Sequence, residues 1–183
     1  MTGKSLLIGS ALIVMTAPAV AAVTVIGSNA ARMCYLAAEA KVSADRTMID
    51  YCDDALREEA LSHYEVVATH VNRGILRFRA GDVGGAIRDY DKALELDPNQ
   101  PEAYLNKGVV LIRQERADAA VPLFTMALEK NTRRPALAYY ARAVAHEKLG
   151  NLRSAYGDYK RAAAEAPDWK EPRSDLARFV VRK

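Results

Sequence analysis

The feature that most constrains this chain is a pattern of small and aromatic residues that returns after thirty-four positions and again after thirty-five. The triplets are Ala86, Tyr90 and Ala93, then Ala120, Phe124 and Ala127, then Ala155, Tyr159 and Ala162. Upstream of them, the segments HVNRG, YLNKG and YYARA end with the same spacings at Gly74, Gly108 and Ala143. Apolar residues around these positions recur every three or four residues, which predicts helices. Each unit is therefore expected to be a helix, a short turn and a second helix.

A single helical hairpin cannot bury its own apolar stripe, so units of this kind are stable as stacks. Small residues let the helix backbones approach closely, and the aromatic residue of each triplet fills the adjoining space. Residues 67–100 resemble the tetratricopeptide repeat at its small, aromatic, turn and terminal proline positions, and residues 101–134 and 136–169 resemble two further copies. The resemblance implies an all-α fold, a right-handed α-solenoid of helix-turn-helix repeats.

Additional helices are expected on both sides of the repeats. Residues 23–65 are predicted to be an N-terminal segment with a degenerate helical pair at 29–65, which a longer connection around residues 62–65 joins to the first repeat. Residues 170–183 are predicted to form a capping helix, because one apolar face continues past the last repeat through Trp169, Leu176, Phe179 and Val180. A charged outer face on such a helix keeps the end of a solenoid soluble.

The second repeat departs from the other two at three positions. Glu115 stands where they have a turn glycine, and Thr132 stands where they have the terminal proline. Pro122 lies early in its second helix, where proline removes one helical hydrogen bond. We therefore expect that helix to start late or to carry a slight kink.

The first residues of the chain have the pattern of a secretory signal. Lys4 precedes an apolar run, and small residues follow Pro18 in an A-x-A-like stretch. We expect residues 1–22 to be this signal, cut after Ala21 or Ala22, in a periplasmic or secreted protein of bacterial type. The alternative is that residues 5–27, which carry no charge, stay as an inner-membrane anchor, because that length can span a bilayer.

Export would change the chemistry of the two cysteines, Cys34 and Cys52. In an oxidising compartment such a pair tends to form a disulfide. Both residues lie in helical patterns joined by a short polar link, so antiparallel helices would bring their Cα atoms within bridging distance of about 4.4–6.8 Å. The bridge would add about 3 kcal/mol on the loop-entropy model. The alternative is two separately buried thiols.

The resemblance implies that the concave surface, lined mainly by the first helix of each repeat, binds a peptide or protein. The groove-facing positions carried over from the family are Val71, Ile75, Phe78, Arg79, Leu105, Val109, Ile112, Arg113, Tyr140, Val144, Glu147 and Lys148. The lining is apolar, with a basic row at Arg79, Arg113 and Lys148 that could meet acidic groups or a C-terminal carboxylate.

Two other fates of this groove stay open. In the first, the protein's own parts cover it, either the apolar stretch VTVIGS that starts at Val23 or the last helix. In the second, the groove forms a homodimer. The family's two-carboxylate clamp for chaperone tails is incomplete. Asn72 and Asn106 match family asparagines, whereas Val71 and Ala141 stand where the clamp needs basic residues.

Other functional classes find little support in the residues. The three histidines are scattered without metal-ligand spacing, and His70 and His146 are expected to be packed helical residues. The glycines of residues 81–85 form a turn with Asp82 as a helix cap, so they do not make a phosphate loop. The acidic pairs of residues 53–54 and 58–59 are expected to form a solvated helix face. No enzyme, cofactor, metal or small-molecule substrate is therefore predicted.

Net charge is −4 over residues 23–132 and +6 over residues 133–183, which would bias the encounter with a charged partner. Basic residues are scattered among acidic ones without aromatic interleaving, so nucleic acid is not expected as a ligand. The sequence thus predicts a non-catalytic protein-binding or peptide-binding adaptor or scaffold of the bacterial cell envelope. The alternative is a membrane-anchored accessory subunit that packs into a larger complex.

Overall fold

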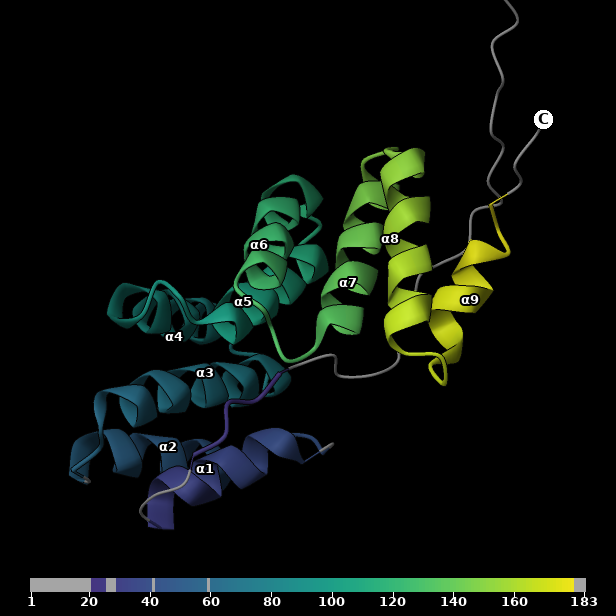
Figure 1. The fold of residues 1–183 in the computed structure, drawn as a ribbon. Helices are drawn as coiled ribbons and strands as arrows, with labels where there is room; N and C mark the ends of the chain where they lie inside the picture. The colour runs from purple at the N-terminus through teal and green to yellow at the C-terminus, as the bar shows by residue number, and fades with distance from the viewer. Residues whose placement is uncertain (1–20, 26–28, 41, 59, 180–183) are drawn as a thin grey trace, which may run out of the picture.

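A computed structural model describes residues 21–25, 29–40, 42–58 and 60–179, and within them every regular element is a helix. The helices follow one another through space in their chain order (Figure 1), which gives a stacked solenoid. Their bounds are α1 Asn29–Glu39, α2 Arg46–Glu58, α3 His63–Arg79, α4 Val83–Leu96, α5 Pro101–Arg113, α6 Ala117–Glu129, α7 Pro135–Lys148, α8 Leu152–Glu165 and α9 Lys170–Leu176.

Three helix pairs, α3/α4, α5/α6 and α7/α8, carry the repeated residues. In the first two pairs, a glycine of one helix faces the aromatic ring of the other. A Cβ at Gly74 would lie 2.5 Å from Cε1 of Tyr90, and a Cβ at Gly108 would lie 2.6 Å from Cε1 of Phe124. Both rings are fully buried. Close approach of the two helices therefore requires glycine at these positions.

The pair α1/α2 precedes the repeats and packs against α3. A disulfide joins Cys34 of α1 to Cys52 of α2, with the two Cα atoms 4.9 Å apart. Antiparallel helices thus bring the two cysteines together, and the predicted pairing is present in the structure.

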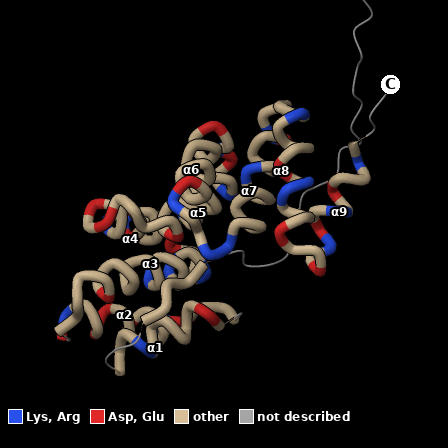
Figure 2. The backbone as a smooth tube through the Cα atoms, viewed as in Figure 1, with Lys and Arg blue, Asp and Glu red and all other residues tan. Residues whose placement is uncertain are grey.

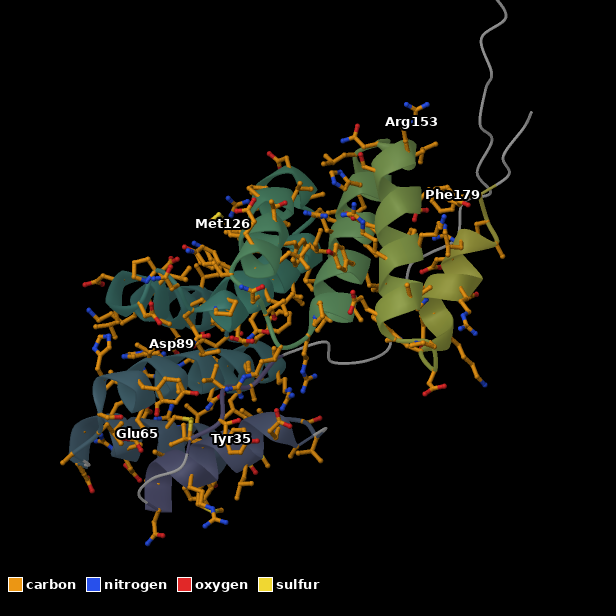
Figure 3. All side chains as sticks on the ribbon, in the orientation of Figure 1. Tyr35, Glu65, Asp89, Met126, Arg153 and Phe179 are labelled. Carbon is orange, nitrogen blue, oxygen red and sulfur yellow. A yellow bond between two sulfur atoms is a disulfide. The ribbon has the colours of Figure 1, made fainter. Side chains whose placement is uncertain are left out.

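A cluster of charged side chains ties α2, α3 and α4 together, and Figure 3 labels its centre, Asp89, between α3 and α4. Arg73 Nη2 lies 2.7 Å from Asp89 Oδ1, and Arg77 Nη1 lies 2.7 Å from Asp89 Oδ2. Arg73 Nη1 also reaches Asp53 Oδ1 of α2 at 2.7 Å. Burial alone would raise the pKa of Asp89, but hydrogen bonds from His70 and Arg73 and the charges of both arginines hold its pKa below the usual value.

Two sequence-based expectations about helix starts are wrong. The connection expected around residues 62–65 is the first turn of α3, because the Ser62 side chain accepts a hydrogen bond from the Glu65 amide while Glu65 reaches back to the Ser62 amide. This reciprocal pair satisfies two amides that the start of a helix leaves open. Of the two outcomes expected from Pro122, a late start of α6 is wrong, since the helix begins at Ala117 and contains Pro122; a slight kink stays a prediction.

The turn inside each repeat requires a backbone with positive φ. Gly81 and Gly150 adopt φ of 87° and 75°, and Glu115 adopts 59° at the corresponding position of the second repeat. A side chain in this left-handed region costs about 1–2 kcal/mol through contact between its Cβ and the carbonyl oxygen. The second repeat therefore carries a local strain that the other two avoid.

Replacing Glu115 with glycine should raise the free energy of unfolding by about 0.5–1 kcal/mol, because the strain relieved exceeds the added backbone entropy of glycine in the unfolded chain. Urea unfolding followed by circular dichroism would measure the change. The matched control is Glu115→Ala, which also removes the exposed ion pair with Lys148 but keeps the strain. An equal gain from both variants would show that charge, and not backbone geometry, limits stability here.

Candidate functional site

The groove-facing positions expected from the sequence lie on α3, α5 and α7. Most are covered within the chain itself. The buried members are Val71, Ile75, Leu105, Val109, Ile112, Tyr140 and Val144. Phe78, Arg79 and Glu147 are half-buried, and Arg113 and Lys148 are exposed.

A short extended segment of the same chain, residues 21–25, occupies the groove over α3 and α5. Asn72 on α3 accepts a hydrogen bond from the Val23 amide at 2.8 Å and donates one to the Val23 carbonyl at 2.8 Å. Asn106 on α5 makes the same pair of bonds with the amide and carbonyl of Ala21, both at 3.0 Å. Figure 1 shows the segment as a purple trace passing α3. Two equivalent asparagines of adjacent repeats therefore hold the main chain at every second residue.

The side chains of this segment alternate between two environments, as in a β-strand. Ala21, Val23 and Val25 are 1%, 4% and 3% exposed, whereas Ala22 and Thr24 are only half-buried. The outward face touches polar groups. Tyr64 donates to the Thr24 carbonyl at 3.1 Å, and Arg133 donates to the Thr24 hydroxyl at 3.1 Å. Shape and main-chain hydrogen bonds, rather than charge, therefore hold the segment in place.

The C-terminal part of the chain covers the groove at the third repeat. Tyr140 donates to Asp175 Oδ2 at 2.8 Å, and its ring packs at a tilt against Trp169 with ring centroids 4.7 Å apart. Burial, with help from this hydrogen bond, raises the pKa of Tyr140, so its hydroxyl stays a donor at neutral pH. Arg178 binds Glu147 through two nitrogens, at 2.6 and 2.9 Å. Repeat three is thus closed by residues that follow α8.

Each member of the expected basic row has a partner inside the chain. Arg79 donates to the Ala40 carbonyl at 2.7 Å and so caps the end of α1. Lys148 lies 2.6 Å from a carboxylate oxygen of Glu115. The Arg113 guanidinium lies over the Phe78 ring, 5.6 Å from its centroid, and remains exposed. Figure 2 shows acidic and basic residues interspersed along the helices, without one continuous basic strip on the face in view.

The described residues hold no group of three or more histidine, cysteine, aspartate or glutamate side chains placed to bind a metal. His70 Nδ1 lies 3.1 Å from Asp89 Oδ1, which places it in the ionic cluster. Burial lowers the pKa of His146 below its usual value. Asp53 faces Arg73 instead of solvent, so this member of the acidic pair departs from the solvated face that was expected.

The asparagines that make the site, Asn72 and Asn106, were noted in the sequence only as remnants of a clamp. Both lie on otherwise apolar faces of α3 and α5 and are at most 1% exposed. A buried amide must find hydrogen-bond partners, because leaving it unpaired costs about 1–3 kcal/mol. An asparagine at the same position of two consecutive repeats was therefore a signal for a bound main chain.

The chain belongs to the tetratricopeptide repeat family, whose sequence pattern it matches over residues 71–135 and 113–168. It is 30% identical over 134 residues to serine/threonine-protein phosphatase 5 of Rattus norvegicus, a match that covers 72% of this chain and 26% of that protein. It is 31% identical over 137 residues to the FK506-binding protein-like protein of Mus musculus, which covers 70% of this chain and 38% of that protein. The chain thus spans only about a quarter to two fifths of these relatives.

Solved structures share the fold. The first repeat domain of Spaghetti (RPAP3), bound to an HSP90 peptide, superimposes with a TM-score of 0.58 at 26% identity, covering 61% of this chain and 87% of that one. MamA from Desulfovibrio magneticus RS-1 superimposes with a TM-score of 0.60 at 23% identity and covers 71% of each chain. These matches support a right-handed helical solenoid.

Replacing Asn72 with leucine should release the N-terminal segment, because the buried amide and carbonyl of Val23 lose both partners. The expected result is rapid hydrogen exchange at the Val23 amide and a loss of about 2 kcal/mol in the free energy of unfolding. The control is Asn151→Leu, at an exposed residue whose side chain makes no helix-capping hydrogen bond. Unchanged protection of Val23 in Asn72→Leu would contradict the site as described.

Proposed function

We propose that this protein is a non-catalytic adaptor that binds an extended peptide in the groove over α3 and α5. One observation carries the proposal. Asn72 and Asn106 each engage both main-chain groups of a residue, and these two residues are two positions apart. Such a pair recognises the backbone of an extended chain, while the apolar lining accommodates alternate side chains.

Membership of the tetratricopeptide repeat family supports protein binding as the general function. Tetratricopeptide repeats are protein-interaction modules that are generally non-catalytic, and the similar domain of Spaghetti was solved with a peptide bound. The similarity to phosphatase 5 spans 26% of that enzyme, and no phosphatase activity is proposed for this chain. The proposed partner is another polypeptide, which binds where residues 21–25 lie.

Site-specific photocross-linking in cells would test the proposal. A photoreactive amino acid is placed at Arg113, which is exposed beside the groove, or at Arg153, an exposed arginine at the start of α8. Cross-links to another polypeptide are expected from position 113, and they should disappear when Asn72 and Asn106 are both leucine. Cross-links from position 153 alone would contradict groove binding, and cross-links only to a second copy would favour the homodimer.

We also propose that the protein is exported to the bacterial envelope, by the signal-like pattern of its first residues. Residues 1–20 lie outside the described part, so this rests on sequence alone. None of the described helices is long and apolar enough to cross a membrane. The disulfide between Cys34 and Cys52 fits an oxidising compartment. In the anchored alternative, the uncharged run of residues 5–27 would have to release residues 21–25 from the groove before it could span a bilayer.

Intact-mass analysis of protein recovered from the envelope separates the two. Loss of the first 21 or 22 residues is expected on export, whereas a full-length mass in the membrane fraction would support the anchored subunit. Denatured, non-reduced protein should also show no free thiol, because Cys34 and Cys52 are joined. Two free thiols would contradict export to an oxidising compartment.

A further inference from the structure

The groove already holds a peptide whose chemistry is known, namely residues 21–25 of the chain itself. We infer that the partner is an uncharged extended segment with a small residue at its first position and a β-branched residue at its third, and that residues 21–25 compete with it in the uncleaved chain. Cleavage after Ala21 or Ala22 would remove the residue that Asn106 holds and so open that end of the groove. This inference rests on the proposed function. It names the class of ligand and the regulation of the same site.

The buried face of the segment defines the first part of the preference. Ala21 is 1% exposed beside Asn106, so a longer side chain there has no room. Val23 is 4% exposed beside Asn72 and packs with Val71 and Ile75 in one core cluster. A β-branched residue suits that position because it also favours the extended backbone that both asparagines bind.

The solvent-facing side of residues 21–25 defines which residues the ligand can carry at its second and fourth positions. Ala22 and Val23 border an open pocket lined by Tyr64, Glu102 and Arg133, among others. The carboxylate of Glu102 is engaged, since it accepts a hydrogen bond from the Arg133 amide at 3.0 Å. Arg133 in turn donates to the Thr24 hydroxyl. This face therefore tolerates polar residues at the second and fourth positions of the ligand.

Charge contributes little to the recognition. Arg79 donates a hydrogen bond to the main-chain carbonyl at the end of α1, and Lys148 forms an ion pair with Glu115. Glu147 of the third repeat accepts a hydrogen bond from Arg178, so its carboxylate is not free to bind a basic ligand. Two exposed cations remain beside the groove: Arg113 lies over the Phe78 ring, and Arg133 already donates to the Thr24 hydroxyl. An acidic peptide would therefore gain little over a neutral one of matching shape.

The chain's own segment is a competitor because it is tethered to the solenoid. Short tethers give effective concentrations in the millimolar range, so a peptide in solution has to displace a local occupant. The observed affinity then falls by the fraction of molecules with an open groove. Variants that expel the segment should therefore bind the same peptide more tightly than the wild-type chain does.

A matched pair of lysine variants in the full chain tests this. Val23→Lys places a charge in the buried position and should expel the segment, whereas Ala22→Lys places it at the neighbouring half-buried position, beside Glu102. The probe is a fluorescent peptide Ala-Ala-Val-Thr-Val with blocked ends, read by anisotropy. We expect Val23→Lys to bind it at least about tenfold more tightly than the wild type and Ala22→Lys do. Adding Asn72→Leu should abolish that binding.

Several results would overturn the inference. Equal affinity in Val23→Lys, Ala22→Lys and the wild type would mean that residues 21–25 do not compete. Tighter binding of an acidic peptide of equal length would mean that charge selects the ligand, and the proposed adaptor function would survive. If Val23→Lys loses its helical circular dichroism, Ala21→Lys expels the segment from the other asparagine and decides the same question. If a lysine variant is folded and its groove is open but it does not bind the peptide, the proposed ligand class is refuted. The adaptor function is tested separately, by the cross-linking from position 113.

Discussion

The close approach of the two helices inside each repeat is the constraint on which the rest of this structure depends. Glycine at positions 74 and 108 leaves room for the rings of Tyr90 and Phe124, which would otherwise meet a Cβ at 2.5–2.6 Å. The buried rings set the separation of the helices in each pair, and the stacked pairs form two core clusters that meet at Phe78. A substitution at either glycine would therefore disturb the packing of its own helix pair, whereas the third pair accommodates Ala143 at the equivalent position.

This packing also creates the groove. It places α3 and α5 as neighbouring first helices, so that Asn72 and Asn106 present their amides to the same side. Two buried amides need partners, and an extended main chain supplies them at every second residue. Residues 21–25 satisfy this requirement within the uncleaved chain, and residues after α8 close the remaining repeat through Tyr140 and Glu147. Binding of a partner is consequently a replacement of contacts that already exist.

Much of the fold could be predicted because the period is carried by side chains that pack. The helical pairs follow from the Ala, Tyr and Gly spacings, and the pairing of Cys34 with Cys52 follows from two helical patterns separated by a short link. The start of α3 was missed because its capping box, Ser62 with Glu65, is a local signal that the repeat alignment did not include. The site was only half predictable. The small and β-branched residues of 21–25 suit an extended segment in a groove, but only the fold places it against Asn72 and Asn106.

The central claim is that the solenoid grips an extended main chain through two asparagines. Nuclear Overhauser contacts in the isotope-labelled full chain test it most directly. The account predicts cross-peaks from the side-chain amide protons of Asn72 to the protons of Val23, and from those of Asn106 to the protons of Ala21. The Nδ2 atoms of the two asparagines lie 2.8 Å and 3.0 Å from the carbonyl oxygens of Val23 and Ala21. Side-chain amides of both asparagines that exchange freely with water and show no contact to residues 21–25 would contradict it.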